Sequence, residues 1–163
     1  MLEATVRPAT QADVEPSVEL LFEIAAEPRS TLGTLPGTPA EFVERVSDWL
    51  RTGEHDILVA VADDRVIGSL WLLREHWVAE VRLKVAADWR DRGVGRALLN
   101  AAEDVARAAG VRKLWLGVYG PNERGRALYE RLGYAIEGVL REQYPRPELG
   151  ETWDKLYMAK FLP

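Results

Sequence analysis

The segment Arg90-Asp91-Arg92-Gly93-Val94-Gly95-Arg96 lies between a predicted strand and the most regular helical pattern of the chain. Two near-adjacent glycines let the backbone turn several N–H groups toward one point, and the start of the helix adds a partial positive charge. The side chains of Arg90, Arg92 and Arg96 add full positive charges. The segment therefore predicts a site for phosphate or pyrophosphate, and the alternative is a glycine turn with solvated arginines.

Two well-known phosphate loops do not match this segment. A Walker loop closes with Gly-Lys-Ser/Thr, whereas Gly95 is followed by Arg96 and Ala97. A dinucleotide fingerprint has Gly or Ala at its third small position, where this chain has Leu98, a residue of the apolar stripe of the helix. Neither of these two loops therefore explains the segment.

Hydrophobic periodicity and turn residues predict the elements on both sides of this loop. Thr38 is the expected N-cap of the second helix, with Pro39 at its first position and Gly53 at its end. A loop is expected at 31–39 and a Pro-rich one at 144–147. Strands are predicted near 5–9, 57–61, 66–73, 80–85, 113–119, 134–139 and 154–161, and helices near 14–25, 39–52, 94–109 and 122–132.

This order of elements predicts an α/β fold. Strands joined by a helix are expected to pair in parallel, and strands joined by turns are expected to pair antiparallel. The result is a single mixed, mostly antiparallel sheet of about seven strands, flanked by about four helices on both sides. The expected apolar stripe of the helix after the loop is Val94, Leu98, Ala101, Val105 and Ala108.

Composition limits the classes of protein that the chain could be. With 163 residues, 47% of them hydrophobic and 29% charged, we expect a single domain spanning 1–163. The absence of cysteine and the presence of only His55 and His76 argue against a metal site and against cysteine or Ser-His-Asp catalysis. A net charge of −5 argues against nucleic-acid and membrane partners. The N-terminus resembles no signal peptide, so a cytoplasmic protein is expected, and the preference for arginine over lysine suggests a bacterial one.

Two segments resemble the motifs of the GNAT superfamily of N-acetyltransferases. The first is Val85-Ala86-Ala87-Asp88-Trp89-Arg90-Asp91-Arg92-Gly93-Val94-Gly95-Arg96-Ala97-Leu98-Leu99, which is similar to the acetyl-CoA loop of that family. The second is Asn122-Glu123-Arg124-Gly125-Arg126-Ala127-Leu128-Tyr129-Glu130-Arg131-Leu132-Gly133-Tyr134. The sequence departs from the family at Ala87, Gly125 and Tyr134, where proline, alanine and phenylalanine are usual. The resemblance covers essentially the whole chain, and its closest branch is that of the phosphinothricin and small-amine acetyltransferases.

The resemblance implies the GNAT fold, with acetyl-CoA in a split of the sheet between 80–85 and 113–119. The pyrophosphate would meet backbone N–H groups of the loop, the pantetheine arm would follow the strand at 83–85, and the N–H of Val85 would polarise the thioester carbonyl. The implied cofactor-binding residues are Leu83, Lys84, Val85, Arg90, Asp91, Arg92, Gly93, Val94, Gly95, Arg96, Asn122 and Tyr129.

The resemblance gives roles to three side chains, each of which has a structural alternative. Asn122 would contact the cofactor, although asparagine is also a favoured N-cap. Tyr129 would donate a proton to the departing thiolate, although a helix aromatic more often packs on a sheet. Glu80 would accept the proton of the incoming ammonium, directly or through water, although it could equally be a surface carboxylate beside Arg82.

Glu80 lies five residues before Val85, so a regular strand places the two side chains on opposite faces unless a bulge intervenes. Weaker candidates for the same role are Glu23, Glu27, Glu75 and His76.

The expected activity is transfer of an acetyl group from acetyl-CoA to a primary amine of a small molecule, in a ternary complex without an acyl-enzyme. Two alternatives remain: a protein N-terminal or lysine acetyltransferase, and a non-catalytic acyl-CoA-binding module. The loop at 31–39 and the segment at 144–150 are expected to set the width of the acceptor groove. Six tryptophans and an apolar last strand would suit a homodimer.

Overall fold

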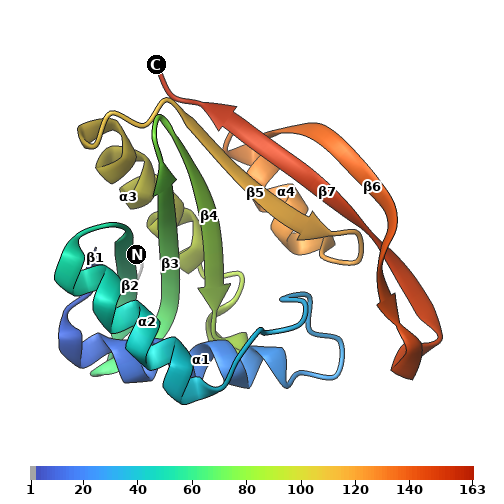
Figure 1. The fold of residues 1–163 in the computed structure, drawn as a ribbon, viewed down its shortest axis with the longest axis horizontal. Coiled ribbons are helices and arrows are strands. Elements are labelled where there is room, and N and C mark those ends of the chain that lie inside the picture. The colour runs from blue at the N-terminus through green and yellow to red at the C-terminus, as the bar shows by residue number, and fades with distance from the viewer. Residues whose placement is uncertain (1–2) are drawn as a thin grey trace.

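A computed structural model describes residues 3–163 and contains the helices and strands shown in Figure 1. The strands are β1 (Thr5–Pro8), β2 (Asp56–Ala62), β3 (Arg65–Glu75), β4 (Val78–Val85), β5 (Lys113–Tyr119), β6 (Ala135–Arg146) and β7 (Glu151–Phe161). The α-helices are α1 (Val14–Ala25), α2 (Pro39–Thr52), α3 (Val94–Ala108) and α4 (Glu123–Arg131), and short 3₁₀ turns occur at η1 (Gln11–Asp13), η2 (Ala87–Trp89) and η3 (Pro147–Leu149).

The strands form one seven-stranded sheet in the order β1-β2-β3-β4-β5-β7-β6. Neighbouring strands are antiparallel except for β4 and β5, which α3 connects and which pair in parallel. The predicted mixed, mostly antiparallel sheet with its flanking helices is therefore confirmed.

The expectation that helix-connected strands pair in parallel holds for β4 and β5 but is wrong elsewhere. β1 and β2 pair antiparallel although α1 and α2 lie between them in the chain. A single helix between two strands brings the chain back to the edge of the sheet where the first strand began, so the next strand runs parallel to it. Two helices in succession bring the chain back to the edge where the first strand stopped, so the next strand runs antiparallel. α4 does connect β5 to β6, but β7 inserts between these two strands.

Local signals define the helix ends as predicted. Thr38 caps α2, its hydroxyl accepts a hydrogen bond from the Glu41 amide, and the Glu41 carboxylate accepts one from the Thr38 amide. Gly53 ends α2 in the left-handed conformation, with φ 67°. In α3 the predicted stripe is only partly correct, because Ala108 is exposed and Ala101 and Val105 are half-buried. The fully buried apolar residues of α3 are Val94, Leu98, Leu99, Ala102 and Ala106.

The helices cover both faces of the sheet. One core lies under α1 and α2, where Val18 and Phe42 pack on Trp71 of β3. The larger core lies on the opposite face, where Leu98 of α3 and Tyr129 of α4 share one cluster with strands from both halves of the sheet. The sheet therefore separates two clusters of buried side chains.

The C-terminal hairpin is longer than predicted. β6 continues through Arg146, where a Pro-rich loop was expected, and Tyr144 pairs with Trp153. Pro145 is compatible with the strand because β6 is the edge of the sheet, where a missing N–H leaves no ladder bond unmade. The extension brings Tyr144 and Arg146 to the loop that follows α1.

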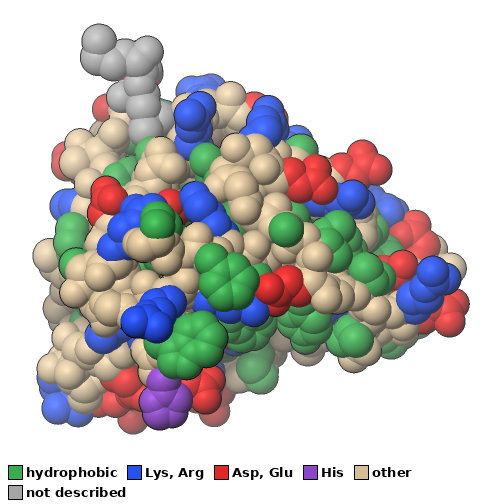
Figure 2. All heavy atoms as spheres, turned by 90° about the horizontal axis from the view of Figure 1, so that it is seen from above, with side chains coloured by type: hydrophobic (Ala, Val, Ile, Leu, Met, Phe, Trp, Pro, Cys, Tyr) green, Lys and Arg blue, Asp and Glu red, His purple; other side chains and the backbone are tan. Residues whose placement is uncertain are grey.

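On the face seen from above, acidic and basic side chains alternate, so the net negative charge is not gathered there (Figure 2). Among the described residues, no helix is both long enough and apolar enough to cross a membrane.

Candidate active site

β4 and β5 pair only at their first residues. The parallel ladder covers Val78–Glu80 against Lys113–Trp115, after which the strands diverge (Figure 1). A cleft of ≈ 1070 Å³ opens from this split toward the loop before α3 and the start of α4. Its walls contain Leu83, Lys84, Val85, Arg90, Asp91, Gly93, Val94, Gly95, Arg96, Asn122 and Tyr129 from the predicted set, together with Ile24, Glu27, Arg29, Thr31, Leu32, Trp89, Pro121, Glu123, Arg124, Gly125, Leu128, Arg131 and Leu132.

The strand β4 presents main-chain polar groups to the split. The Ala86 amide donates to Ile67 of β3 (2.9 Å), and successive amides of a strand point to opposite sides. The N–H and C=O of Val85 and Leu83 therefore point away from β3 and toward the split. The Val85 carbonyl accepts a hydrogen bond from Arg90 Nε (3.2 Å), and because the ladder with β5 ends at Glu80 the Val85 N–H faces the cleft and not a strand.

The loop before α3 has the shape that the two glycines predicted. Asp91 and Gly93 adopt left-handed conformations (φ 60° and 84°), and Gly93 is the N-cap of α3. A helix start leaves its first backbone N–H groups without intrahelical partners. Gly95 lies against Leu128 and Leu83, and a Cβ there would come within 3.1 Å of the Leu128 side chain. Loop and helix thus present backbone donors to the cleft at close range.

The predicted arginines differ in what they do. Arg90 donates two hydrogen bonds to the Glu27 carboxylate (2.6 and 3.0 Å). This ion pair connects the loop to the segment just after α1. Arg92 lies over the Trp89 ring, 5.0 Å from its centroid, and is not part of the cleft wall. Arg96 does line the cleft.

The cleft is more basic than the chain as a whole. Its walls contain the arginines at 29, 90, 96, 124 and 131 against the carboxylates of Glu27, Asp91 and Glu123. Arg124 Nε lies 3.4 Å from Asp91 Oδ1, so the start of α4 is beside the loop. The local balance therefore favours an anionic ligand although the chain carries a net charge of −5.

Asn122 is the N-cap of α4, and its Oδ1 accepts a hydrogen bond from the Gly125 amide (3.0 Å). The structural alternative for this side chain is therefore present in the structure. The cap also explains Gly125, because a Cβ there would lie only 2.6 Å from Asn122 Nδ2. Asn122 lines the cleft as well, so capping and ligand contact are compatible.

Tyr129 lies in the wall formed by α4 and is 8% exposed. Burial raises the pKa of its hydroxyl to about 12. Its ring packs 5.8 Å from that of Tyr134, whose own hydroxyl is buried and has no hydrogen-bond partner among the described residues. Tyr129 is thus a protonated phenol at the cleft surface throughout the neutral pH range.

Glu80 is not part of the cleft wall. It lies at the last paired position before the split, opposite Trp115, and its carboxylate accepts two hydrogen bonds from Arg82 (2.9 and 3.1 Å). The register between β3 and β4 is continuous from Gly68–Val85 to Glu75–Val78, so no bulge changes the parity of the strand. Glu80 therefore stays on the face opposite Val85.

Lys84 is fully buried beside the cleft, on the same face of β4 as Glu80 and Arg82. Its Nζ lies 3.4 Å from the centroid of the Trp71 ring and has no hydrogen-bond partner among the described residues. Burial, followed by the charge of Arg82, lowers the pKa of Lys84 well below its ordinary value. The Trp71 face favours the protonated amine by about 2 kcal/mol, but removing an ammonium from water costs several kcal/mol. Burial therefore decides the direction of the shift.

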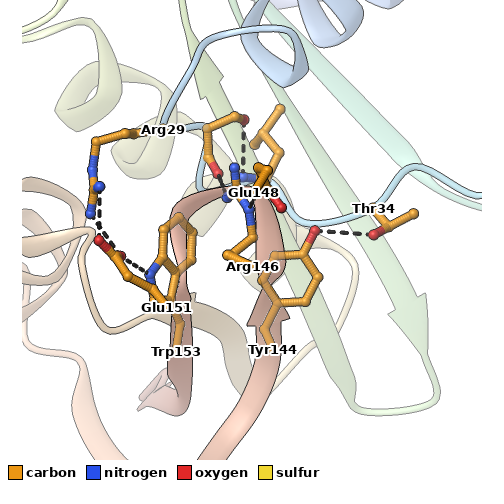
Figure 3. A network of polar contacts seen from close by, with 9 residues as sticks. Arg29, Thr34, Tyr144, Arg146, Glu148, Glu151 and Trp153 are labelled. Atoms are coloured by element: carbon orange, nitrogen blue, oxygen red, sulfur yellow. Dashed lines mark hydrogen bonds and ion pairs between the residues drawn. The ribbon is translucent and has the colours of Figure 1, made fainter.

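A set of contacts crosses the open end of the split and joins the loop after α1 to the β6–β7 hairpin (Figure 3). Arg146 donates to the Ser30 carbonyl (2.7 Å), and the hydroxyls of Thr34 and Tyr144 lie 3.0 Å apart. Arg29 donates two hydrogen bonds to Glu151 (2.9 and 3.0 Å), whose carboxylate also accepts from Trp153 Nε1 (2.7 Å). Arg146 further bonds to Glu148 and lies over the Trp153 ring, 4.4 Å from its centroid. We call these contacts the strap.

Some functional side chains of the cleft were not predicted. Glu27 was only a weak candidate, and nothing in the sequence indicated that Ile24 and Leu32 would form the wall facing β4. The loop at 31–39 was expected to border the acceptor groove, and Thr31 does line the cleft. The pairing of Arg90 with Glu27 joins residues 63 positions apart, which local periodicity cannot reveal.

A mixed sheet that splits beyond one short parallel ladder, with a glycine loop and a helix start at the open end, defines the class of acyl-CoA-dependent N-acyltransferases. The model of the Acetyltransferase (GNAT) family matches residues 19–134. The chain therefore belongs to the GNAT acetyltransferase family.

Curated relatives agree with this assignment. The putative phosphinothricin acetyltransferase YwnH of Bacillus subtilis is 28% identical, and the alignment covers 97% of this chain and 96% of that protein. The phosphinothricin N-acetyltransferase of Streptomyces coelicolor is 26% identical, with 93% and 92% covered. The mycothiol acetyltransferase of Beutenbergia cavernae is 42% identical over 52% of this chain, but the match spans only 29% of that longer protein. The two phosphinothricin-named relatives thus match nearly the whole chain.

Solved structures share the fold over nearly the full length. An N-acetyltransferase from Staphylococcus aureus Mu50 superimposes with a TM-score of 0.86 at 20% identity, covering 98% of this chain and 99% of that one. A phosphinothricin acetyltransferase from Sinorhizobium meliloti, in complex with AcCoA, gives a TM-score of 0.84 at 24% identity, covering 98% and 89%.

Proposed function

We propose that this protein transfers an acetyl group from acetyl-CoA to a primary amine of a small molecule, in a ternary complex and without an acyl-enzyme. The observation that carries the proposal is the split itself. It places the free N–H of Val85, the backbone donors before α3 and the Tyr129 hydroxyl in one cleft. No cysteine exists in the chain to carry an acyl group.

The cleft fits coenzyme A in shape and charge. A pyrophosphate is an anion with many acceptor oxygens, and the donors around Gly93 and Gly95 are main-chain N–H groups at a helix start, which suit such an anion. Arg96 supplies a positive charge, whereas Arg90 acts mainly by holding Glu27 and the loop in place. An extended pantetheine arm would pair with the unpaired edge of β4 at Leu83 and Val85, as an added strand does.

When bound, acetyl-CoA supplies an acetyl thioester that an amine can attack. The Val85 N–H would donate a hydrogen bond to the developing oxyanion. Tyr129 would give its proton to the sulfur of the departing coenzyme, which fits a phenol whose pKa of about 12 keeps it protonated until the thiolate forms. Glu80 remains a predicted proton acceptor, and from beside Arg82 it would have to act through ordered water.

The strap favours a small acceptor over a polypeptide. The two segments expected to set the groove width touch each other through Thr34 with Tyr144 and through Ser30 with Arg146. A groove bridged in this way admits a compact amine, whereas a peptide needs an open channel. Two curated relatives that match along nearly the whole chain are named for phosphinothricin, which is also a small molecule.

The first test is thermal unfolding with and without acetyl-CoA, with free adenosine diphosphate as the reference ligand. At about 100 times its dissociation constant, acetyl-CoA adds ~2.7 kcal/mol to the free energy of unfolding. For a domain of this size, the melting temperature should then rise by roughly 5–11 °C. The absence of a shift in folded protein would contradict the proposal.

Gly93→Ala and Gly110→Ala form a matched pair for this test. Both glycines have a positive φ (84° and 78°), and neither Cβ would meet an atom within 4 Å. Each variant should therefore lose about 1 kcal/mol of stability from backbone strain alone. Only Gly93→Ala is expected to reduce the shift caused by acetyl-CoA, because its methyl group enters the proposed phosphate site.

Thiol release with a panel of primary amines then identifies the acceptor class. Small amines are expected to be acetylated, and peptides with a free N-terminus or lysine are expected to be poor acceptors. Binding of acetyl-CoA without transfer to any amine would instead support a non-catalytic acyl-CoA-binding module.

Pairing of two copies also remains a prediction. The exposed edge strand β6 carries Ile136, Val139 and Leu140 at the surface, each at least 40% exposed. Light scattering of the protein in solution measures the mass directly.

A further inference from the structure

One face of β5 and β7 is lined by aromatic side chains that stay partly open. In the described part of the chain, α4 covers the other face of these strands and no helix covers this one (Figure 1). Trp115 of β5 lies opposite Glu80 at the end of the β4–β5 ladder, so their side chains share this face. Alternation along β5 and its register with β7 place four more residues there: Gly117, Tyr119, Lys155 and Tyr157. These five residues of β5 and β7 are half-buried or exposed, and we call them the aromatic face.

Lys155 lies across Gly117 of the neighbouring strand. A Cβ at Gly117 would come within 2.6 Å of Lys155 Cε, so only a glycine leaves room for the lysine in this position. The ammonium lies 5.3 Å from the centroid of the Tyr157 ring and 5.7 Å from that of Tyr119, and both rings attract a cation. These three neighbours fix a positive charge in the middle of the aromatic face.

Lys155 has no counter-ion among residues 3–163, because the carboxylates around the aromatic face are bound elsewhere. Asp154 is on the opposite face of β7 and accepts a hydrogen bond from the Glu142 amide. The loop at 31–38 has no titratable side chain. The carboxylates of β4 and of the strap pair with arginines: Glu80 with Arg82, Glu148 with Arg146, and Glu151 with Arg29. The aromatic face therefore carries a positive charge that a ligand can neutralise.

The strap lies next to Lys155. Tyr144 packs on Tyr119 with 4.7 Å between the ring centroids, and its hydroxyl lies 3.0 Å from that of Thr34. A Cβ at Gly33, in the same loop, would come within 3.0 Å of the Tyr119 hydroxyl. Tyr119 thus contacts the strap on one side and Lys155 on the other. In the proposed function the strap encloses the acceptor, so Lys155 borders the place where the acceptor would lie.

The position of Tyr129 also assigns the acceptor to this side of the sheet. Tyr129 reaches the cleft from the face under α4, where it belongs to the larger core. An amine that attacks a thioester held in the split would approach from the side opposite the group that protonates the sulfur. The remainder of the acceptor would then lie over the aromatic face.

We propose that Lys155 binds an anionic group of the acceptor, so that the preferred acceptor has a primary amine at one end and a carboxylate or phosphonate-type anion at the other. The inference rests on the proposed function and names the substrate class of its site. The ammonium of Lys155 would donate hydrogen bonds to the anion. The rings of Trp115, Tyr119 and Tyr157 would pack on the carbon chain between the two charged ends. A diamine would instead bring a second positive charge toward Lys155 and be repelled.

The test compares acceptors that differ only in the second group. The pairs are γ-aminobutyrate with butylamine and δ-aminovalerate with pentylamine, and aminopropylphosphonate represents the other kind of anion. We expect kcat/KM to be roughly tenfold or more higher for an anionic amine than for the matching alkylamine, mainly through a lower KM. High salt should reduce this ratio. The better of the carboxylate and the phosphonate identifies the anion, and equal kcat/KM for all these amines would overturn the inference.

Substitution of Lys155 assigns the preference to its charge. In Lys155→Met the ratio of anionic to neutral acceptor should fall to about one, and Lys155→Arg should keep most of it. Lys155→Glu should reverse it in favour of the diamine putrescine. Lys113→Met is the matched control, since Lys113 also lies over an aromatic ring but already pairs with Glu137, and its ratio should equal that of the wild type. A wild-type ratio in Lys155→Met would overturn the inference.

Gly117→Ala tests the position of the charge without removing it. The new Cβ would push the end of Lys155 away from the strand, so the ratio should fall although the lysine remains. Gly138→Ala of β6 is its control, because no atom lies within 4 Å of a Cβ there. All of these variants should keep the thermal shift with acetyl-CoA. If the wild-type protein acetylates no amine of any charge, the proposed function itself fails, whereas equal acetylation of anionic and neutral amines overturns only this inference.

Discussion

Single residues in the cleft differ in how much of their role comes from local sequence. Asn122 caps its own helix by accepting a hydrogen bond from the amide three residues later, and a Cβ at Gly125 would crowd that cap. Arg90 and Lys84, in contrast, contact residues far away in the chain, Glu27 and Trp71. The first kind of contact follows from the chain order, and the second depends on packing.

Tyr129→Phe tests the proton donor at this scale. We expect kcat to fall by about 10²-fold or more, because the thiolate then leaves without a positioned acid. The affinity for acetyl-CoA should change little, since main-chain groups hold the coenzyme. Steady-state kinetics and the acetyl-CoA thermal shift measure the two quantities separately.

Tyr134→Phe is the control for that variant. Its ring packs against Tyr129, yet its hydroxyl is buried, has no partner among residues 3–163 and does not face the cleft. Activity should therefore be retained, with stability unchanged or slightly higher once an unsatisfied hydroxyl is removed. Equal activity of both phenylalanine variants would remove Tyr129 from the mechanism.

At the scale of elements, the strap joins the two halves of the molecule across the open end of the split. Its members come from the loop after α1 and from the ends of β6 and β7 (Figure 3). The strap exists because β6 extends beyond the predicted strand to Arg146. A longer edge strand thus brings Tyr144 and Arg146 into contact with the loop after α1.

Arg146→Ala tests the strap. The Ser30 carbonyl loses its donor and Trp153 loses its cationic neighbour, so we expect the free energy of unfolding to drop by about 1–3 kcal/mol. If the strap encloses the acceptor, as the proposed function implies, the KM for the small amine should rise more than kcat falls, because the strap takes no part in proton transfer. Urea unfolding and acceptor kinetics measure these changes.

Arg141→Ala, on the same strand, is the control. Arg141 is exposed and forms no ion pair with the described part of the chain, so both quantities should stay at wild-type values. An unchanged KM in Arg146→Ala would show that the strap does not border the acceptor.

At the scale of the whole molecule, the two halves of the sheet share one core despite the short β4–β5 ladder. Leu70 of β3, Leu114 of β5 and Met158 of β7 belong to the same buried cluster as Leu98 of α3. Loss of either half would expose the apolar surface of the other. The split is therefore a feature of the strand edges and not a boundary between two folding units.

We expect this single core to unfold in one cooperative transition. Tryptophans in both halves, Trp71 on β3 and Trp153 on β7, report on the two sides of the split. Urea curves followed by tryptophan fluorescence and by far-UV circular dichroism should coincide. Two separate transitions would show that the halves are stabilised independently.

Much of the fold could be predicted because its signals are local. Helix caps such as Thr38 and Gly53, alternation in β4 and the glycine turn before α3 depend on residues a few positions apart. The order of elements and the two family motifs followed from them. The candidate site was predicted as far as it consists of main-chain groups, because the sequence of a loop and a helix start determines where those groups point.

The sequence by itself determined the elements, the mixed sheet, the glycine turn before α3 and eleven of the residues that line the cleft. Tertiary structure alone decided that β1 and β2 run antiparallel, that Arg90 binds Glu27, that the strap crosses the split and that Lys84 lies buried on Trp71. The physical reason is distance along the chain. Hydrogen-bonded turns are set by neighbouring residues, whereas burial, and with it the charge of a side chain, depends on which remote elements pack against it.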